Sequence, residues 1–150
     1  MKTIGHKLIA TGAIIASLAM IGSGCATGQV TWGPEERAMI TNRAFPFAYE
    51  MVFDAVLRTF EDNGYPIINI DKKNGLVNTD YKSAGAVLFG TGKVKMSARI
   101  IKEEDNITRV NLNIHFEGYS DTFGVAMTDD LIKKKDYEKT FNAILKRIKQ

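Results

Sequence analysis

Two stretches of this chain alternate between apolar and polar residues, and they constrain its fold more than any other feature. The stretches are residues 93–102 and 107–117, and their apolar positions are Val94, Met96, Ala98, Ile100, Val110, Leu112, Ile114 and Phe116. A period of two indicates a β-strand with one buried and one solvated face, which is typical of antiparallel sheets. The polar residues 103–106 between the two stretches predict a short turn.

Two further strands are expected before this pair. Residues 65–70 and 76–82 are rich in β-branched and other strand-forming residues. Between them, Asn74-Gly75 supplies the left-handed backbone conformations of a tight turn. Pro66 favours an edge or the start of a strand. We therefore expect four strands that follow one another as an antiparallel meander.

Helices are expected on both sides of the strands. Residues 47–63 carry apolar side chains at helical spacing, and Gly64 follows them as a typical helix terminator. A second apolar stripe predicts a helix over residues 130–150. A short helix is also expected over 34–40, before the main elements. The sequence thus predicts an α+β fold: a four-stranded antiparallel meander with two helices packed on one face, in the order helix, four strands, helix.

The first 25 residues have the layout of a secretory signal peptide. Lys2 and Lys7 give a positive start, residues 8–21 are uncharged and mostly apolar, and small residues then lead to Cys25, the only cysteine. The segment Ile21-Gly22-Ser23-Gly24-Cys25 resembles the lipobox of bacterial lipoproteins. This resemblance implies cleavage before Cys25 and acyl chains, such as palmitate, on its thiol.

The resemblance to lipoproteins also implies a location. Ala26 follows the cysteine, which is similar to the outer-membrane sorting pattern of Gram-negative lipoproteins. In such a cell the protein would be lipid-anchored in the outer membrane and face the periplasm; in other bacteria it would lie on the outer face of the cell membrane. The implied organisation is a signal peptide (1–24), a lipidated tether (25–33) and a single α+β domain (34–150).

The N-terminal segment has two alternative interpretations. An uncleaved membrane anchor is disfavoured because the apolar run is shorter than the ~20 residues of a spanning helix and contains Thr11, Gly12 and Ser17. A catalytic thiol is disfavoured because no histidine lies near Cys25 in sequence, and one cysteine cannot form an internal disulfide. Removal of residues 1–24 lowers the formal net charge from +3 to +1, since Lys2 and Lys7 leave without an acid. A charge this small is not a nucleic-acid-binding signature.

A second resemblance covers the first half of the predicted domain. The segments Tyr49-Glu50-Met51-Val52-Phe53-Asp54-Ala55-Val56, Gly64-Tyr65, Ile70-Asp71 and Gly75-Leu76-Val77 look like the repeated module of the BamC family, the lipoprotein C subunits of the outer-membrane β-barrel assembly machinery. They are also similar to other small periplasmic lipoproteins of the helix-grip type. The resemblance implies a helix-grip module in the cell envelope, present here once.

The sequence offers no catalytic set. His115 is the one histidine beyond the predicted signal peptide, and we expect it to be a solvated strand residue. The acidic clusters 103–105 and 129–130 lack the alternating spacing of a calcium loop. The glycine-rich segment 85–93 lacks the spacing of a phosphate-binding loop. We therefore expect a protein that is not an enzyme and that uses no metal and no cofactor.

The outward positions of the two alternating strands are basic. Lys93, Lys95, Arg99, Arg109 and His115 are expected there with no acid among them. Such a face could attract an anionic partner. We favour a simple solvated face that discourages edge-to-edge aggregation.

Apolar residues in two glycine-containing loops suggest a binding surface. Residues 83–92 hold Val87, Leu88 and Phe89, and residues 118–128 hold Tyr119 and Phe123. In a meander both loops leave the sheet at the same end, whereas the charged turns lie at the other end. Exposed apolar loop residues are typical of partner contacts. The alternative is that these side chains fold back and plug the core.

These observations lead to a functional hypothesis. We expect a cell-envelope lipoprotein that acts as a non-catalytic adaptor or accessory subunit for a protein partner, in outer-membrane assembly or maintenance. The alternative is a periplasmic lipid- or glycan-binding module, with a pocket between the first long helix and the sheet lined by Tyr49, Phe53 and Phe60.

Overall fold

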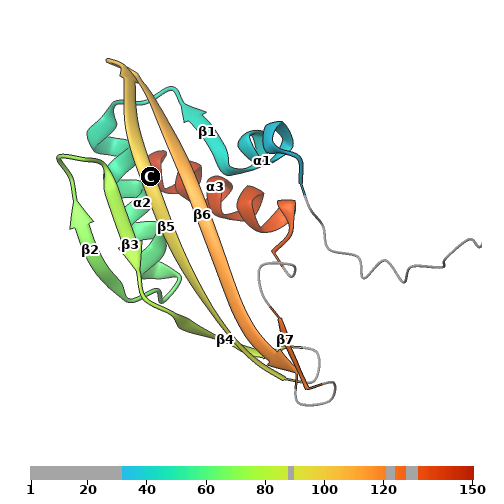
Figure 1. Ribbon diagram of the computed structural model, residues 1–150. Helices are drawn as coiled ribbons and strands as arrows, with labels where there is room; N and C mark the ends of the chain where they lie inside the picture. Colours follow the sequence, from blue (N-terminus) through green and yellow to red (C-terminus); the bar gives the residue numbers. More distant parts are fainter. Residues whose placement is uncertain (1–31, 88–89, 121–123, 128–131) are drawn as a thin grey trace, which may run out of the picture.

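The computed structural model describes residues 32–87, 90–120, 124–127 and 132–150. Within these residues the chain forms three helices and one antiparallel sheet of seven strands (Figure 1). The expected α+β class with an antiparallel sheet is confirmed. The expected number of four strands is wrong, because β1, β4 and β7 were not predicted.

Two long strands form the spine of the sheet. β5 (Gly90–Glu104) pairs with β6 (Ile107–Ser120) along nearly their whole length, with Val94 opposite Phe116 and Met96 opposite Ile114. The two alternating stretches of the sequence are therefore paired as neighbouring antiparallel strands, as expected. Directly opposite residues share a face of the sheet, so the apolar positions of both strands face the same side.

Shorter strands flank the two halves of this spine. At one half of the spine, β3 pairs with β5, β2 pairs with β3, and β1 pairs with β6 on the opposite edge. At the other half, β4 pairs with β5 and β7 pairs with β6. Their bounds are β1 Asn42–Phe45, β2 Ile67–Asp71, β3 Leu76–Thr79, β4 Lys82–Val87 and β7 Val125–Met127. The strands β2, β3, β5 and β6 pair in this order, as in the expected meander, but β4 intervenes along the chain between β3 and β5.

The single strand expected over residues 76–82 is interrupted at Asp80 and Tyr81. There the backbone N–H of Asp80 donates to Pro66 O (2.8 Å), and the Asp80 carboxylate accepts the backbone N–H of Tyr81 (2.7 Å). The first bond continues the β2–β3 pairing by one residue, since Ile67 is opposite Thr79, and the second is local to the link before β4. The chain resumes as β4, so β3 and β4 pair with successive parts of the same edge of β5.

The two segments expected to be loops, 83–92 and 118–128, are largely strand. Residues 82–87 pair with 90–94, and residues 118–120 pair with 125–127, so each segment contributes to a β-hairpin. Gly85 lies beside a register shift in β4. Its φ is +77°, a backbone angle that a residue with a side chain rarely adopts. The glycines that suggested loops in the sequence therefore lie in segments that extend the sheet.

The helices cover one face of this sheet. They are α1 (Pro34–Thr41), α2 (Tyr49–Asp62) and α3 (Lys134–Ile148), and α2 and α3 both lie behind the sheet in the view of Figure 1. α3 starts four residues later than expected. The carboxylate of Asp136, in its first turn, accepts the backbone N–H of Lys133 (2.8 Å), which fixes the start of the helix there.

The core fills the space between these helices and the inner face of the sheet. Its most completely buried large side chains are Phe45, Phe53, Phe60, Phe141, Leu112 and Ile144. Phe116 is buried, whereas Asn113 on the same strand is exposed, as the alternation predicts. The buried core residues of the described ranges lie between Ile40 and Ile144.

None of the helices in the described ranges is long and apolar enough to cross a bilayer. Residues 1–31, which include the apolar run 8–21 and Cys25, lie outside the described residues.

Candidate functional site

One end of the sheet projects past the helical layer (Figure 1). We call this part the hairpin arm: β4, β7 and the adjoining ends of β5 and β6, residues 82–94, 116–120 and 124–127 without 88–89. Two of the five proposed contact residues, Val87 and Tyr119, belong to this arm. Val87 lies in β4 and Tyr119 in β6, and Tyr119 is 50% exposed. Leu88, Phe89 and Phe123 lie outside the described residues.

The expectation that both glycine-containing segments reach the same end of the sheet is met by their described parts. Thr91 is opposite Tyr119, and Gly92 is opposite Gly118. A shallow hollow lies on the arm, lined by Thr91, Gly92, Lys93, Glu117, Gly118 and Tyr119. The half-exposed Tyr119 ring lies at this hollow, so the arm offers a shallow surface with an aromatic side chain next to it.

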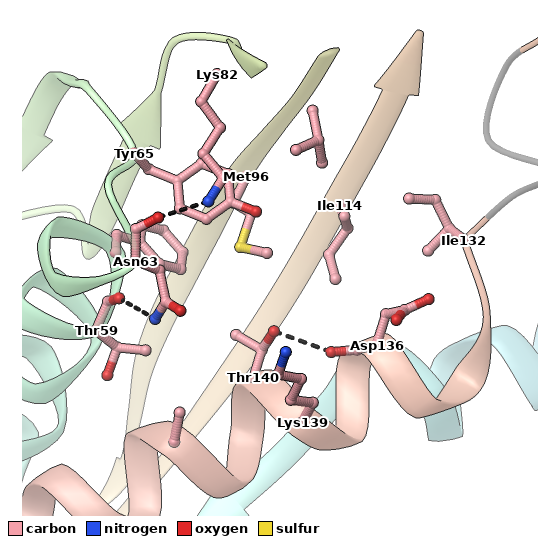
Figure 2. A pocket seen from close by; sticks show the side chains of 13 residues that line it. Thr59, Asn63, Tyr65, Lys82, Met96, Ile114, Ile132, Asp136, Lys139 and Thr140 are labelled. Atoms are coloured by element: carbon pink, nitrogen blue, oxygen red, sulfur yellow. Dashed lines mark hydrogen bonds between the residues drawn. The ribbon is translucent and has the colours of Figure 1, made fainter. Parts of the chain in front are cut away.

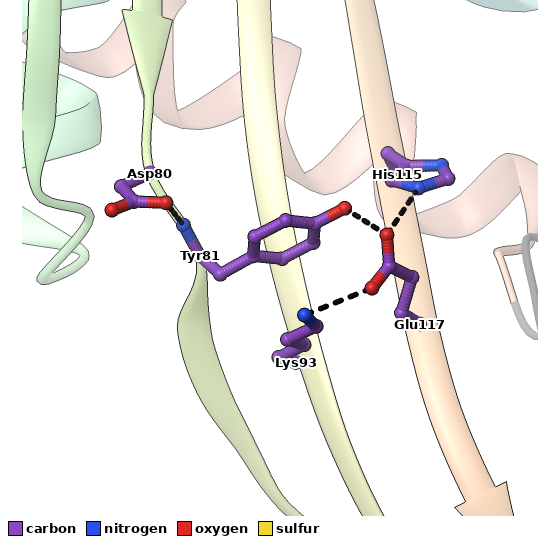
Figure 3. A network of polar contacts seen from close by, with 5 residues as sticks. All are labelled: Asp80, Tyr81, Lys93, His115 and Glu117. Atoms are coloured by element: carbon purple, nitrogen blue, oxygen red, sulfur yellow. Dashed lines mark hydrogen bonds and ion pairs between the residues drawn. The ribbon is translucent and has the colours of Figure 1, made fainter.

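A polar network joins Tyr81, directly before β4, to β5 and β6 at the root of this arm (Figure 3). Its centre is the Glu117 carboxylate on β6, which accepts a short hydrogen bond from the Tyr81 hydroxyl and pairs with Lys93 of β5 (2.9 Å). Nε2 of His115 lies 3.2 Å from the same carboxylate. The ammonium groups of Lys93 and Lys95 lie 4.2 and 4.6 Å from the centre of the Tyr81 ring.

This network changes the interpretation of the basic sheet face. The face was expected to carry no acid, but Glu117 lies among its cations, and Glu103 pairs with Arg109 (2.6 Å). Strand alternation places Glu117 on the same side as His115, and the sequence analysis left it out. The cations of this face are thus partly neutralised, which weakens it as an anion-binding surface.

The electrostatics of Glu117 disfavour acid–base catalysis. The hydrogen bond from Tyr81, followed by that from Lys93, lowers the pKa of the Glu117 carboxyl from its usual 4.5 to about 2. A general base works best with a pKa near the operating pH, so this carboxylate is a weak base. The cluster also lies on the side of the sheet away from the helices, where its acidic and basic side chains are one third to one half exposed. Its geometry fits a structural role, in which these contacts hold the start of β4 against β5 and β6.

The Glu117 carboxyl should titrate near pH 2 in the folded protein. Because its pKa is lower in the folded than in the unfolded chain, its stabilising contribution is present above about pH 4.5 and is lost as pH falls toward 2. Carbon-13 NMR of the carboxyl group measures this. Tyr81→Phe should raise the Glu117 pKa, whereas Asn113→Ala on the same strand should leave it unchanged. An unchanged pKa in Tyr81→Phe would contradict the network.

A cavity of about 250 Å³ lies between α2, α3 and the inner face of the sheet (Figure 2). Apolar side chains from both layers line most of it: Phe60, Tyr65, Val94, Met96, Ile114, Ile132 and Ala143. Polar side chains complete it: Thr59, Asn63, Lys82, Asp136, Lys139 and Thr140. The cavity therefore combines an apolar interior with polar groups, which is the usual make-up of a small-molecule site.

The end of α2 places Tyr65 in this cavity. After the helix, Gly64 takes a φ of +72°, its N–H donates to Glu61 O (2.8 Å), and the N–H of Tyr65 donates to Phe60 O (3.0 Å). These two bonds form a Schellman motif, and its usual hydrophobic contact is the Tyr65 ring against Phe60, with ring centres 6.2 Å apart. The turn thereby fixes where the Tyr65 side chain points.

A pocket is present between the first long helix and the sheet, with α3 as a further wall, but its lining differs from the expected one. Of Tyr49, Phe53 and Phe60, only Phe60 lines the cavity. Phe53 is 1% exposed in the core, and the Tyr49 ring packs beside it, with the Tyr49 hydroxyl donating to Lys72 O (2.5 Å). The aromatic stripe of α2 fills the core instead of lining a pocket. Sequence reasoning missed three cavity residues, Tyr65, Lys82 and Lys139. The only sequence signal for any of them is the helix-ending Gly64-Tyr65 pair, which points to Tyr65.

In the described ranges, no group of three or more His, Cys, Asp and Glu side chains is placed to hold a metal ion. Compared with known proteins, the chain matches no family model and no curated protein. The function is therefore argued from the arm, the network and the cavity themselves.

Proposed function

We propose that this chain is a lipid-anchored protein of the cell envelope that acts as a non-catalytic adaptor or accessory subunit. Acyl chains on Cys25 would hold it in the membrane, and the hairpin arm would contact a protein partner. In a Gram-negative cell the membrane would be the outer one and the domain would face the periplasm. The lipobox-like segment 21–25 supports the anchor.

The observation that carries the adaptor role is the hairpin arm. It is a piece of sheet that extends beyond the helices, with the half-exposed Tyr119 beside a shallow hollow. Within the described residues, β4 and β7 each have one neighbouring strand, so each leaves an edge. Proteins usually protect exposed sheet edges, and edges left open accept an extended segment of a partner as an added strand.

The short tether supports a partner close to the membrane. Trp32 packs edge-on against Tyr137 of α3, with ring centres 5.9 Å apart, so Trp32 is already part of the folded domain. The seven residue steps from Cys25 to Trp32 reach at most about 25 Å. A lipid on Cys25 would thus keep the domain within a few nanometres of the bilayer, where a membrane-associated partner could meet the arm.

Tyr119→Asp should abolish recovery of the partner without unfolding the domain. The substitution puts a charge at the centre of the proposed contact, and a half-exposed side chain contributes little to the core. The measurement pairs the thermal midpoint of the protein with recovery of crosslinked partners from envelopes. Phe89→Asp and Phe123→Asp are expected to act in the same way if their side chains join this surface.

The matched control is Ile101→Asp, which places the same charge on an exposed apolar residue of β5 near the other end of the sheet. It should leave partner recovery unchanged. If Tyr119→Asp folds and still captures every partner, the contact lies elsewhere, and the face with Lys95, Arg99 and Arg109 becomes the next candidate. If it unfolds, the arm is part of the core and not a contact surface.

A further inference from the structure

We propose that the cavity between α2, α3 and the sheet binds a single-chain amphiphile, with the hydrocarbon chain inside and an anionic head at the lysines of its rim. This inference does not depend on the partner contact of the hairpin arm. The cavity faces the helices, whereas the hollow beside Tyr119 lies on the arm, so the two proposals can fail separately.

The inner face of the sheet is incompletely covered at this cavity. Ala98 and Ile100 of β5 are buried beneath the helices, but Val94 and Met96, further along the same face, remain partly exposed. Apolar inner-face residues that the protein does not cover leave favourable surface for an apolar ligand. Figure 2 shows Met96 and Ile114 on one side of the cavity and Thr140 of α3 on the other.

The size of the cavity limits the chain that fits. Its volume of about 250 Å³ holds roughly eight groups the size of a water molecule, at about 30 Å³ each. A methylene group is of similar size. The cavity therefore fits a straight chain of about eight carbons, and a longer acyl chain would extend out of it.

The Tyr65 hydroxyl is the group that points to a ligand. Tyr65 is 8% exposed, and its hydroxyl points into the cavity in Figure 2. No hydrogen bond links this hydroxyl to any residue of the described ranges. No fully buried side-chain nitrogen or oxygen of the described residues lacks a hydrogen-bond partner, so this oxygen is accessible from the open cavity. Burial of the side chain, with the nearby Asp136 carboxylate second, raises the pKa of Tyr65, so the hydroxyl keeps its proton and can donate it to a ligand in the cavity.

The charges around the cavity favour an anionic acceptor. Lys82 and Lys139 contribute two ammonium groups, and Asp136 is the one carboxylate among the lining residues. Asp136 already accepts the backbone N–H of Lys133 at the start of α3. Nζ of Lys82 donates to Asn63 O (2.5 Å) and lies 4.2 Å from the centre of the Tyr65 ring, which holds it beside the hydroxyl. A carboxylate or phosphate at this point would accept from both groups.

Methyl NMR of the full mature chain in phosphatidylcholine nanodiscs tests the proposal. With carbon-13 in the methionine methyl groups, Met96 reports on the cavity, while Met39 and Met51 are exposed elsewhere, at 75% and 49%. Octanoate should shift the Met96 signal in a saturable manner and leave Met39 and Met51 unchanged. Octylammonium and 1-octanol, with the same chain and no anionic head, should bind at least tenfold more weakly.

Three variants separate the parts of the site. Tyr65→Phe removes only the hydroxyl and should weaken octanoate about tenfold, as expected for one hydrogen bond to a charged group. Lys139→Gln should weaken it about threefold, since the ammonium is exposed. Lys135→Gln, an exposed lysine of the same helix outside the cavity, should have no effect. If Tyr65→Phe does not fold, the comparison of octanoate binding by Lys139→Gln and Lys135→Gln tests the proposal instead.

Octyl phosphate distinguishes the two sources of such a head. Tighter binding of octanoate assigns the site to fatty acids, tighter binding of octyl phosphate assigns it to phosphate-headed lipids, and equal binding means that charge and chain suffice. The proposal is overturned if neither anion shifts Met96, if Met39 and Met51 shift to the same extent, or if octylammonium binds as tightly as the anions.

Discussion

Gly75→Ala is expected to unfold the domain, whereas Gly64→Ala should leave it folded. Both glycines have nearly the same backbone conformation, with φ of +70° and +72°. A left-handed conformation costs alanine about 1–2 kcal/mol at either position. The difference is in the surroundings: a Cβ at Gly75 would lie 2.0 Å from the backbone oxygen of Ile100, whereas nothing lies within 4 Å of one at Gly64.

The contact at Gly75 cannot relax easily. The backbone oxygen of Gly75 accepts the N–H of Ile100 (2.7 Å), which joins the turn to the buried part of β5. The hydroxyl of Tyr49 on α2 donates to Lys72 O in the same turn (2.5 Å). Because backbone on both sides would have to move, we expect a loss above ~4 kcal/mol, in the range that single substitutions seldom reach.

Urea unfolding of the two variants and the unsubstituted protein provides the measurement. Gly64→Ala should lower the urea midpoint modestly, and the slope of its unfolding free energy against urea concentration should not change. Gly75→Ala should show no folded baseline. Equal losses in the two variants would mean that left-handed backbone alone matters, and that the close approach of the 71–75 turn to Ile100 does not exist in solution.

The parts of the fold that sequence predicted are those in which burial repeats along the chain. The strict alternation around Met96 and Ile114 follows from a strand with one covered face, and it predicted two neighbouring strands whose apolar side chains face the same side. The apolar stripe of α2 and the glycine after it predicted that helix to within two residues at each end. In these elements each local signal agrees with the final fold.

The missed strands have no such local signal. β1 is four residues long and is an edge strand because β6 offers a pairing edge, with the Asn111 amide donating to the side chain of Asn42 (2.9 Å). β4 contains Gly85 and small residues, and β7 is only three residues long; both are strands because β5 and β6 extend past the helices. Strand formation of this kind depends on distant neighbours rather than on the segment's own residues.

The cavity was invisible to sequence reasoning for a related reason. Its apolar residues, such as Met96 and Ile114, follow the same alternation as the core, so nothing in the sequence marks them as uncovered. The cavity exists because α2 and α3 leave a gap where Tyr65 and Lys82 enter from one side and Lys139 from the other. Such a gap depends on how the helices pack, which hydrophobic periodicity does not specify.

Cys25→Ala is expected to leave a precursor that keeps residues 1–24 and carries no lipid. In the lipoproteins that the segment 21–25 resembles, the lipid on the thiol precedes cleavage, so loss of the thiol blocks both steps. Anchoring should be lost with it, because buried acyl groups contribute ~0.8 kcal/mol per CH₂ and stable attachment takes more than one chain. Intact mass of the purified unsubstituted protein and of the variant measures processing and acylation together.

The matched control is Ser23→Ala, which keeps a small residue before the cleavage point and should be processed and acylated normally. An unsubstituted chain that starts at residue 25 without added acyl mass would contradict lipidation, and normal cleavage of Cys25→Ala would contradict the role of the thiol. Loss of the lipid should also affect the hairpin arm, because the lipid and a tether of no more than about 25 Å keep the arm near the membrane. Crosslinking to a membrane-bound partner through Tyr119 should therefore decrease while the fold is unchanged.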